Sequence, residues 1–494
     1  MTMPAEGIET AEFDVIVLGG GPVGENLAQY AMEDSDVTAA IVEGERFGGE
    51  CSYWACIPSK ALLRPAAVAD TSAHLQGMDP GRLERDDLLA RRDAWVSHYD
   101  DSGQYDWVEG AGITPVRGHG RLVGEREVEV EGEGGALGSH APRGRRDEGA
   151  SKGGTRRLRA RRAVVIATGS EPVVPPPYRD AHPWGSRDAT AVTEVPDRLA
   201  VIGGGVVACE AATWMAALGA HVTMLVRGSG LLAGQEPFVG EVVADSLRAK
   251  GVDVRLSTEA TEVTRPAGED TGVGRVHGGP VTLTTAGGTV EADELLVATG
   301  RRPRLGDIGL EAVGLSPEDV TAGRRPEWLH PLGDAGGEAP LTHWGKYRAR
   351  VLGGGIAAEE TGRPVEPVPT DVPVPQVVFT DPQLGTVGLT EQAARDAGHD
   401  VATNEVPFSG AAGGALLRDD VTGRASIVVD RADGVLLGAT FVGPEAGELV
   451  HGATIAIVGT VPVHLLRHAV PSFPSASELW LRLLEGLSKE LRRA

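Results

Sequence analysis

Cysteine is scarce in this sequence, which has three among 494 residues. A secreted framework of disulfides needs more thiols, so the composition argues against a disulfide-rich extracellular protein. Long apolar runs are also missing: no stretch approaches the roughly 18 residues of a membrane-spanning helix, and the polar first residues lack a signal-peptide core. We therefore expect a cytoplasmic protein without membrane insertion.

The sequence has few basic residues relative to acidic ones. It contains 46 Lys and Arg and 70 Asp and Glu, which give a formal net charge of -24. An acidic surface repels polyanions, which argues against nucleic acid and anionic membranes as partners. We accordingly interpret the basic cluster 156–162 as a solvated charged face. The length and the 41% of hydrophobic residues predict about two to four domains with sufficient hydrophobic core.

Two of the cysteines, Cys51 and Cys56, lie five positions apart in the stretch 48–60. Five residues of regular helix rise about 7.5 Å, which exceeds the usual Cα separation of a disulfide. Cys51 is therefore expected at a distorted helix entry, which Gly48 and Gly49 permit. A bond that closes so short a loop constrains the unfolded chain little. The pair thus predicts a redox-active disulfide rather than a disulfide that stabilises the fold.

A first glycine-rich unit begins with an apolar strand over 13–18 and a turn containing Gly19, Gly21 and Gly24. A helix over 25–32 and a second strand over 37–42 follow, and Glu43 ends the second strand. In this context the glycines let the backbone approach a pyrophosphate, and the helix N-terminus offers N–H groups to it. The acid accepts hydrogen bonds from the ribose hydroxyls. The unit predicts a dinucleotide site.

The pattern repeats with a strand over 199–202, the turn Gly203–Gly205, a helix over 209–218 and a strand over 221–226. Two such units imply two nucleotide cofactors, one fixed and one exchanged. Arg227 then stands where an NAD site places an acid. Arginine can pair with a 2′-phosphate, which favours NADPH, although a simply solvated arginine is the alternative.

The remaining residues predict further elements. Strands are expected over 123–130, 163–166, 295–297, 376–379, 425–429 and 435–442, the last two as a hairpin. Helices are expected over 86–99, 445–457 and 477–487. The segment 132–154, rich in Gly, Arg, Ser and Glu, has no apolar periodicity and is interpreted as a long exposed loop or disordered insertion.

Taken together, these motifs resemble the flavin-dependent pyridine nucleotide-disulfide oxidoreductases, the family of dihydrolipoamide dehydrogenase, glutathione reductase and mercuric reductase. The resemblance rests on both glycine units, the Gly-Gly-x-Cys-x-x-x-x-Cys-x-Pro-Ser-Lys stretch, two Ala-Thr-Gly echoes at 167–169 and 298–300, Gly333-Asp334 and the segment 378–382. It implies an α/β fold with two Rossmann-like domains, for FAD and NAD(P)H, and an α+β domain that forms a homodimer.

The resemblance also implies boundaries and cofactor contacts. The FAD domain would comprise 1–175 and 298–365, the NAD(P)H domain 176–297 and the dimerisation domain 366–494. The implied cofactor-binding residues are Gly19, Gly21, Gly24, Glu43, Gly49, Lys60, Thr168, Gly169, Gly203, Gly205, Arg227, Gly300, Gly333 and Asp334.

The implied catalytic residues are Cys51, Cys56, Lys60, Glu210 and Glu478. In such a family member Cys56 would be the flavin-proximal thiolate, and Cys51 would attack a substrate disulfide. Lys60 would approach the flavin with Glu210 as its partner, because a buried ammonium needs a carboxylate. The third cysteine, Cys209, matches no family thiol and is expected to be a packed small side chain.

One departure from the family bears on the acceptor. The family places a histidine acid/base before Pro474, oriented by a glutamate that matches Glu478, but this chain has Phe473. General acid/base catalysis contributes about 10² to 10⁴-fold, and His468 is out of register. Three hypotheses follow: a disulfide reductase with a nonstandard substrate and base, a reductase of quinones or other diffusible acceptors, and a redox-sensing or structural flavoprotein with little turnover. Mercury reduction is not expected, because the vicinal cysteines of mercuric reductases are absent.

Overall fold

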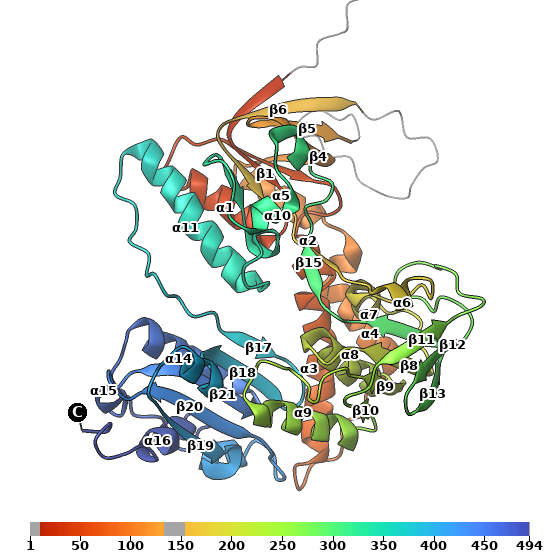
Figure 1. Ribbon diagram of the computed structural model, residues 1–494, viewed down its shortest axis with the longest axis vertical. Coiled ribbons are helices and arrows are strands. Elements are labelled where there is room, and N and C mark those ends of the chain that lie inside the picture. The colour runs from red at the N-terminus through yellow and green to blue at the C-terminus, as the bar shows by residue number, and fades with distance from the viewer. Residues whose placement is uncertain (1–9, 133–153, 494) are drawn as a thin grey trace, which may run out of the picture. The chain divides into compact units, whose positions relative to one another are not determined.

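The computed structural model describes residues 10–132 and 154–493, which form a mixed α/β chain (Figure 1). The chain divides into two compact units. The first comprises residues 1–57, 96–171 and 301–368, and the second comprises 58–95, 172–300 and 369–494. The sequence-based division separates 176–297 from 366–494, and it stays a prediction.

The first unit is built on a sheet with the strand order β3-β2-β1-β6-β5-β4, with β16 beside β6. Its strands are β1 (Thr10–Leu18), β2 (Ala39–Glu43), β3 (Thr114–Arg117), β4 (His119–Gly124), β5 (Glu127–Glu131), β6 (Thr155–Ile166) and β16 (Leu329–Pro331). β1 runs parallel to both of its neighbours, β2 and β6. Since β2 and β6 flank β1, the loops after these parallel strands meet at one edge, where such sheets bind ligands.

The helices of the first unit include α1 (Pro22–Met32) and α11 (Thr342–Thr361), which lie side by side in Figure 1. Gly353 of α11 allows this close approach, because a Cβ there would lie 2.8 Å from the carbonyl oxygen of Leu27. The other elements of this unit are α2 (Gly49–Tyr53), η1 (Ser97–Tyr99), α5 (Ser102–Gly110), β15 (Arg301–Pro303), η2 (Leu310–Val313), α10 (Pro317–Thr321) and η3 (Gly333–Gly336).

Two strand predictions in this unit need correction. The single strand expected over 123–130 is wrong: β4 and β5 form an antiparallel hairpin that turns at Arg126, whose φ is 58°. The strand expected over 163–166 begins instead at Thr155, so the basic cluster 156–162 lies within β6. Exposed arginines alternate there with buried Leu158 and Ala160. The insertion expected over 132–154 lies, apart from its end residues, outside the described part.

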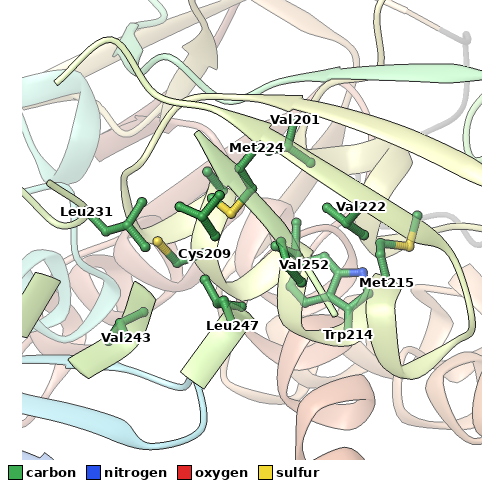
Figure 2. Packing of buried hydrophobic residues seen from close by; sticks show 14 of the residues in the cluster. Val201, Cys209, Trp214, Met215, Val222, Met224, Leu231, Val243, Leu247 and Val252 are labelled. Atoms are coloured by element: carbon green, nitrogen blue, oxygen red, sulfur yellow. The ribbon is translucent and has the colours of Figure 1, made fainter. Parts of the chain in front are cut away.

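The second unit contains a parallel sheet of order β10-β9-β8-β14. Its strands are β8 (Arg198–Ile202), β9 (His221–Leu225), β10 (Asp253–Arg255) and β14 (Glu294–Val297). Helices α8 (Val206–Ala217) and α9 (Pro237–Ala249) bury apolar side chains in one cluster with this sheet. Figure 2 shows Cys209 in that cluster, near Leu231 and Met224. Burial raises the pKa of the Cys209 thiol to about 12, so its expected role as a packed side chain is confirmed.

The C-terminal part of the second unit is an antiparallel sheet of order β17-β18-β21-β20-β19. The strands are β17 (Gln376–Val378), β18 (Gln383–Gly388), β19 (Val401–Pro407), β20 (Arg424–Asp430) and β21 (Leu436–Gly443). The predicted hairpin of β20 and β21 is confirmed, whereas β18 and β19 were not predicted. The two C-terminal helices are also confirmed, as α14 (Ala446–Val458) and α16 (Glu478–Glu485).

A long helix, α3 (Cys56–Ala73), carries the second cysteine at its first residue. The helix expected over 86–99 ends earlier, as α4 (Arg85–Trp95). The other elements are β7 (Ser170–Pro172), α6 (Pro176–Arg179), α7 (Ser186–Thr190), β11 (Ala260–Thr264), β12 (Val281–Thr285), β13 (Gly288–Ala292), α12 (Glu391–Asp396), η4 (Phe408–Gly410), α13 (Ala412–Ala415) and α15 (Val463–Leu466). No helix in the described ranges has the length and apolarity to cross a membrane.

Candidate active site

The first glycine loop joins β1 to α1 and leaves no room for a side chain at Gly19 or Gly24. A Cβ on Gly19, whose φ is +112°, would lie 2.3 Å from the carbonyl oxygen of Ala167, and a Cβ on Gly24 would lie 2.1 Å from that of Gly19. The residue before α1, Gly21, supplies no side-chain cap, so the first N–H groups of the helix remain for a ligand. These residues fit the pyrophosphate of a dinucleotide.

Glu43 ends β2 beside this loop, as the sequence predicts. Its Oε2 accepts a hydrogen bond of 2.7 Å from the backbone N–H of Gly20, and its Oε1 accepts one of 2.6 Å from that of Glu45. Burial raises the pKa of this carboxyl group. Gly49 also abuts the loop, because a Cβ there would lie 2.7 Å from Gly21 Cα. The redox stretch therefore begins against the predicted cofactor loop.

Two further predicted cofactor segments meet within the first unit. Ser170 Oγ donates a hydrogen bond of 2.6 Å to Asp334, and the Nε of Arg301 donates one of 2.8 Å to the same hydroxyl. Thr168 Oγ1 donates to the carbonyl oxygen of Arg304 at 2.6 Å. The segments that follow Gly169 and Gly333 are thus joined by hydrogen bonds, and their contact with a flavin ribityl chain stays a prediction.

The two cysteines lie at a break between two helices. Cys51 is in the short helix α2, which two left-handed glycines precede and open: Gly48 has φ +97° and Gly49 has φ +59°. α2 ends at Tyr53, and α3 begins at Cys56. The expected distorted helix entry is therefore confirmed. Both cysteines are in the thiol form.

Thr342 contacts both thiols and was missed by sequence reasoning. Its Oγ1 lies 3.3 Å from Cys51 Sγ and 3.4 Å from Cys56 Sγ. Thr342 is the first residue of the 20-residue helix α11, and the preceding Leu341 provides no side-chain cap. The uncapped N-terminus of a helix stabilises a nearby thiolate. The hydrogen bond with Cys56, followed by burial, raises the pKa of Cys51.

Lys60 and Glu210 form the expected pair in the second unit. Lys60 Nζ lies 3.0 and 2.9 Å from the two carboxylate oxygens of Glu210, whose side chain is 6% exposed. Phe379 was not assigned a role from the sequence, yet its backbone N–H donates to Glu210 at 2.8 Å and its ring centroid lies 4.2 Å from Lys60 Nζ. The ammonium is therefore held by a carboxylate and an aromatic face.

The second glycine loop repeats the geometry of the first. A Cβ on Gly203, whose φ is +127°, would lie 2.4 Å from the carbonyl oxygen of Ala298, and Gly205 leaves the N-terminus of α8 without a side-chain cap. Gly300 also has a left-handed φ, +131°. Arg227 follows β9 and is exposed, and its guanidinium forms no ion pair within the described ranges. The loop fits a second dinucleotide.

The sequence predicts that Phe473 stands in place of the family's histidine, with Glu478 retained. Phe473 is 76% exposed, while Glu478 is 7% exposed and its Oε2 has no hydrogen-bond partner among the described residues. His468, the out-of-register alternative, is exposed. The carboxylate that orients a histidine in the family is thus buried here without that histidine.

Glu25, on the first turn of α1, is a buried acid that the sequence did not single out. Its side chain accepts a hydrogen bond of 3.0 Å from Gln104 Nε2, and burial raises its pKa to about 7. Below pH 4.5 the group is protonated in both the folded and unfolded states. As pH rises from there to about 7, only the unfolded state releases its proton, so stability is lost.

We expect Glu25→Gln to stabilise the protein at pH 8 by about 1 to 3 kcal/mol and to change little at pH 4.5. Urea unfolding of the purified protein at both pH values measures this difference. Glu33→Gln, at the exposed end of the same helix, is the control. An equal effect of Glu25→Gln at the two pH values would show that burial does not raise the pKa of Glu25 in the folded protein.

Known proteins resemble the chain over most of its length. The family model of the pyridine nucleotide-disulphide oxidoreductases matches residues 13–318, and the model of their dimerisation domain matches residues 374–483. The mercuric reductase of Shigella flexneri is 32% identical over 492 residues, covering 96% of this chain and 79% of its own. The dihydrolipoyl dehydrogenase of Haloferax volcanii is 31% identical, covering 96% of both chains.

Solved structures share the fold. The Cu(II) complex of the HOCl-induced flavoprotein disulfide reductase RclA from Escherichia coli has a TM-score of 0.78 at 21% identity, covering 97% of this chain and 100% of that one. LpdA from Mycobacterium tuberculosis has a TM-score of 0.77 at 22% identity, covering 96% and 99%. The matched family is FAD-dependent, and both glycine loops fit dinucleotides. The chain therefore belongs to the pyridine nucleotide-disulphide oxidoreductases.

Proposed function

We propose that the chain is a homodimeric FAD enzyme that passes electrons from NAD(P)H through the Cys51–Cys56 pair to a disulfide or another small acceptor. The observation that carries this proposal is the contact of both thiols with one hydroxyl, Thr342 Oγ1, at 3.3 and 3.4 Å. The side chains of Cys51 and Cys56 also hydrogen-bond each other, so the two sulfurs are close enough to form and break a disulfide. The matched dimerisation domain supports the homodimer.

The residues of the chain then have distinct tasks. Bound FAD supplies the two-electron relay between nicotinamide and cysteines. Cys51 loses its proton and attacks one sulfur of the substrate disulfide, forming a mixed disulfide, and the first sulfur leaves as a thiolate that takes up this proton. Cys56 attacks the Cys51 sulfur, releases the second thiol and leaves the cysteine pair oxidised. The substrate gains the two electrons that the pair loses, and NAD(P)H restores the thiols.

A second candidate function is the reduction of quinones or other diffusible acceptors directly at the flavin. The exposed Phe473 favours it, because phenylalanine cannot exchange a proton with a thiol. One-step transfer to a diffusible acceptor needs no such residue. The intact cysteine pair favours the first candidate, since a direct reductase would not need two thiols held by Thr342.

Steady-state assays test the proposal. The holoenzyme is assayed with lipoamide, glutathione disulfide and a quinone, each with NADH and with NADPH. We expect flavin reduction by a nicotinamide and slow reduction of lipoamide and glutathione disulfide, because the acid/base histidine is replaced. Fast lipoamide turnover would overturn the argument from Phe473, and purification without FAD would overturn the proposal itself.

Arg227 supports a preference for NADPH, because its exposed guanidinium follows β9 and is free of ion pairs among the described residues. We expect Arg227→Ala to lower kcat/KM for NADPH roughly tenfold or more relative to NADH, and Arg227→Lys to retain part of the preference. Flavin reduction followed at varied concentrations of each nucleotide measures the ratio. A wild-type preference for NADH by tenfold would remove this role.

A further inference from the structure

A cluster of four charged side chains lies near the C-terminal end of α3, entirely within the second unit. α3 provides Asp70, Lys250 follows α9, Asp381 lies in the loop between β17 and β18, and Arg418 follows α13. We call these four residues the Asp381 cluster. Their side chains are 15 to 22% exposed, so the charges are mostly buried. None of the four is among the predicted catalytic or cofactor-binding residues.

The Asp381 cluster balances two acids with two bases. Lys250 Nζ lies 3.3 Å from Asp70 Oδ2 and 3.1 Å from Asp381 Oδ2. Arg418 forms an ion pair with Asp70 and lies 3.8 Å from Asp381. Burial, followed by a hydrogen bond with Asp70, raises the pKa of Asp381 to about 6, so both acids are ionised at pH 8. Removal of one base would therefore leave a mostly buried carboxylate without its counter-charge.

Further hydrogen bonds hold the segments that carry the Asp381 cluster. Ser246 Oγ donates to the carbonyl oxygen of Asp381, so α9 also holds the loop 379–382 through its backbone. The backbone N–H of Asp419 donates to the carbonyl oxygen of His74 at 3.0 Å, which docks the loop after α13 on the end of α3. The cluster therefore joins α3, α9 and two loops of the C-terminal sheet.

The loop 379–382 also contacts the Lys60–Glu210 pair. The backbone N–H of Phe379, the first residue of the loop, donates to Glu210 Oε1 at 2.8 Å. The centroid of the Phe379 ring lies 4.2 Å from Lys60 Nζ. Asp381 is the third residue of the same loop, so only two peptide bonds separate the Asp381 cluster from the residue that contacts the pair. The position of Phe379 therefore depends on where the cluster holds Asp381.

We infer that the Asp381 cluster positions Glu210, and through it Lys60, for the reduction of the flavin by NAD(P)H. The inference rests on the flavin reduction proposed above and adds four positioning residues to it. They act through Phe379 rather than by contact with a cofactor. The reduction transfers two electrons and one proton as hydride from NAD(P)H to the flavin, and the cluster itself is neither oxidised nor reduced. Loss of one cluster residue lets the loop 379–382 move away from Glu210, and the misplaced pair then lowers the rate.

A cluster that only stabilised the fold would affect flavin reduction in a different way. Lower stability decreases the amount of folded holoenzyme, but it leaves the rate constant of each folded molecule unchanged. An effect that passes through Glu210 also disappears when Glu210 is removed, whereas the effects of independent sites add. The dependence on Glu210 therefore distinguishes a positioning role from a purely structural one.

The test is a double-mutant cycle on the rate constant of flavin reduction, measured by stopped flow on the holoenzyme at pH 8 with saturating nucleotide. We expect Arg418→Gln to lower this rate constant about three- to tenfold, while the nucleotide concentration that gives the half-maximal rate stays unchanged. Arg418→Lys keeps the positive charge and should recover part of the loss. In a background that carries both Lys60→Met and Glu210→Met, Arg418→Gln should have no further effect.

Asp381→Asn is the second variant of the cycle. Burial raises the pKa of Asp381 and so favours its uncharged form, which is why this variant is expected to fold. It should lower the rate constant about twofold or more in the wild-type background and not in the double-methionine background. The control is Arg424→Gln, which removes an exposed arginine that pairs with Glu405 in the same antiparallel sheet. It should leave the rate constant unchanged in both backgrounds.

The outcomes separate this inference from the proposed function. Equal fold decreases in the two backgrounds, or unchanged rate constants in both cluster variants, would overturn the positioning role while flavin reduction stands. An equal decrease in Arg424→Gln would assign the effect to a general loss of charge pairs and overturn the role as well. If Arg418→Gln does not fold, Asp381→Asn decides by the same criteria. If neither nucleotide reduces the flavin of the wild-type holoenzyme, the proposed function itself fails.

Discussion

Cys56→Ser is expected to lower disulfide reduction by about 10³-fold or more while NAD(P)H-dependent reduction of a quinone persists. A serine hydroxyl is not ionised at neutral pH and cannot form a disulfide, so the exchange stops after the mixed disulfide at Cys51. Cys51→Ser should stop it earlier, before any mixed disulfide forms. Assays with a disulfide and with a quinone, run on the same holoenzyme preparations, measure the two activities separately.

The third cysteine provides the control for these variants. Cys209 is fully buried in an apolar cluster (Figure 2), and Cys209→Ala should keep both activities. Mass spectrometry after mixing with substrate distinguishes the two serine variants, because only Cys56→Ser can trap substrate on the protein. Disulfide turnover that survives in Cys56→Ser would contradict the proposed exchange and leave the direct flavin pathway as the function.

Glu210→Ala is expected to lower the free energy of unfolding by about 2 to 3 kcal/mol and flavin reduction by NAD(P)H by about 10²-fold. The variant leaves the Lys60 ammonium and the Phe379 N–H without their acceptor. The expected decrease in the free energy of unfolding is smaller than for a fully buried pair. The Lys60 side chain is 34% exposed, so water compensates in part for the lost carboxylate. Chemical unfolding and stopped-flow flavin reduction measure the two effects.

A double variant separates stability from catalysis at this pair. Lys60→Met combined with Glu210→Met removes both charges, and we expect it to recover stability but not flavin reduction. Glu241→Gln, an exposed acid on the neighbouring α9, should change neither quantity. If the double variant reduces its flavin at the wild-type rate, the pair is only structural and its assignment to the cofactor is wrong.

Both glycine units could be predicted from the sequence because their signals are local. A strand, a glycine turn and a helix follow each other within about twenty residues, and the turn at Gly19 or Gly203 admits no side chain. The C-terminal strands β18 and β19 gave weaker signals. β18 contains Gly385 and Gly388, and β19 contains Asn404 and Glu405 and ends at Pro407, all of which are unfavourable in strands.

The contacts around the thiols could not be predicted, because they depend on the packing of distant segments. Thr342 is 291 residues from Cys51 and 286 from Cys56 along the chain. Phe379 belongs to a motif that supported the resemblance, but its N–H bond to Glu210 spans 169 residues. The hairpin of β4 and β5 was mistaken for one strand because residues 127–130 alternate between polar and apolar, although the charged run 125–127 interrupts this alternation at the turn.

The contact of one hydroxyl with two sulfurs limits the charge that the reduced centre can hold. The Thr342 hydroxyl has a single proton, so it can donate to only one sulfur at a time. A second thiolate would lose this donor and would meet the repulsion of the first, in agreement with the raised pKa of Cys51. The reduced pair therefore stores two electrons with one negative charge and one proton. It takes up or releases its charge in single steps.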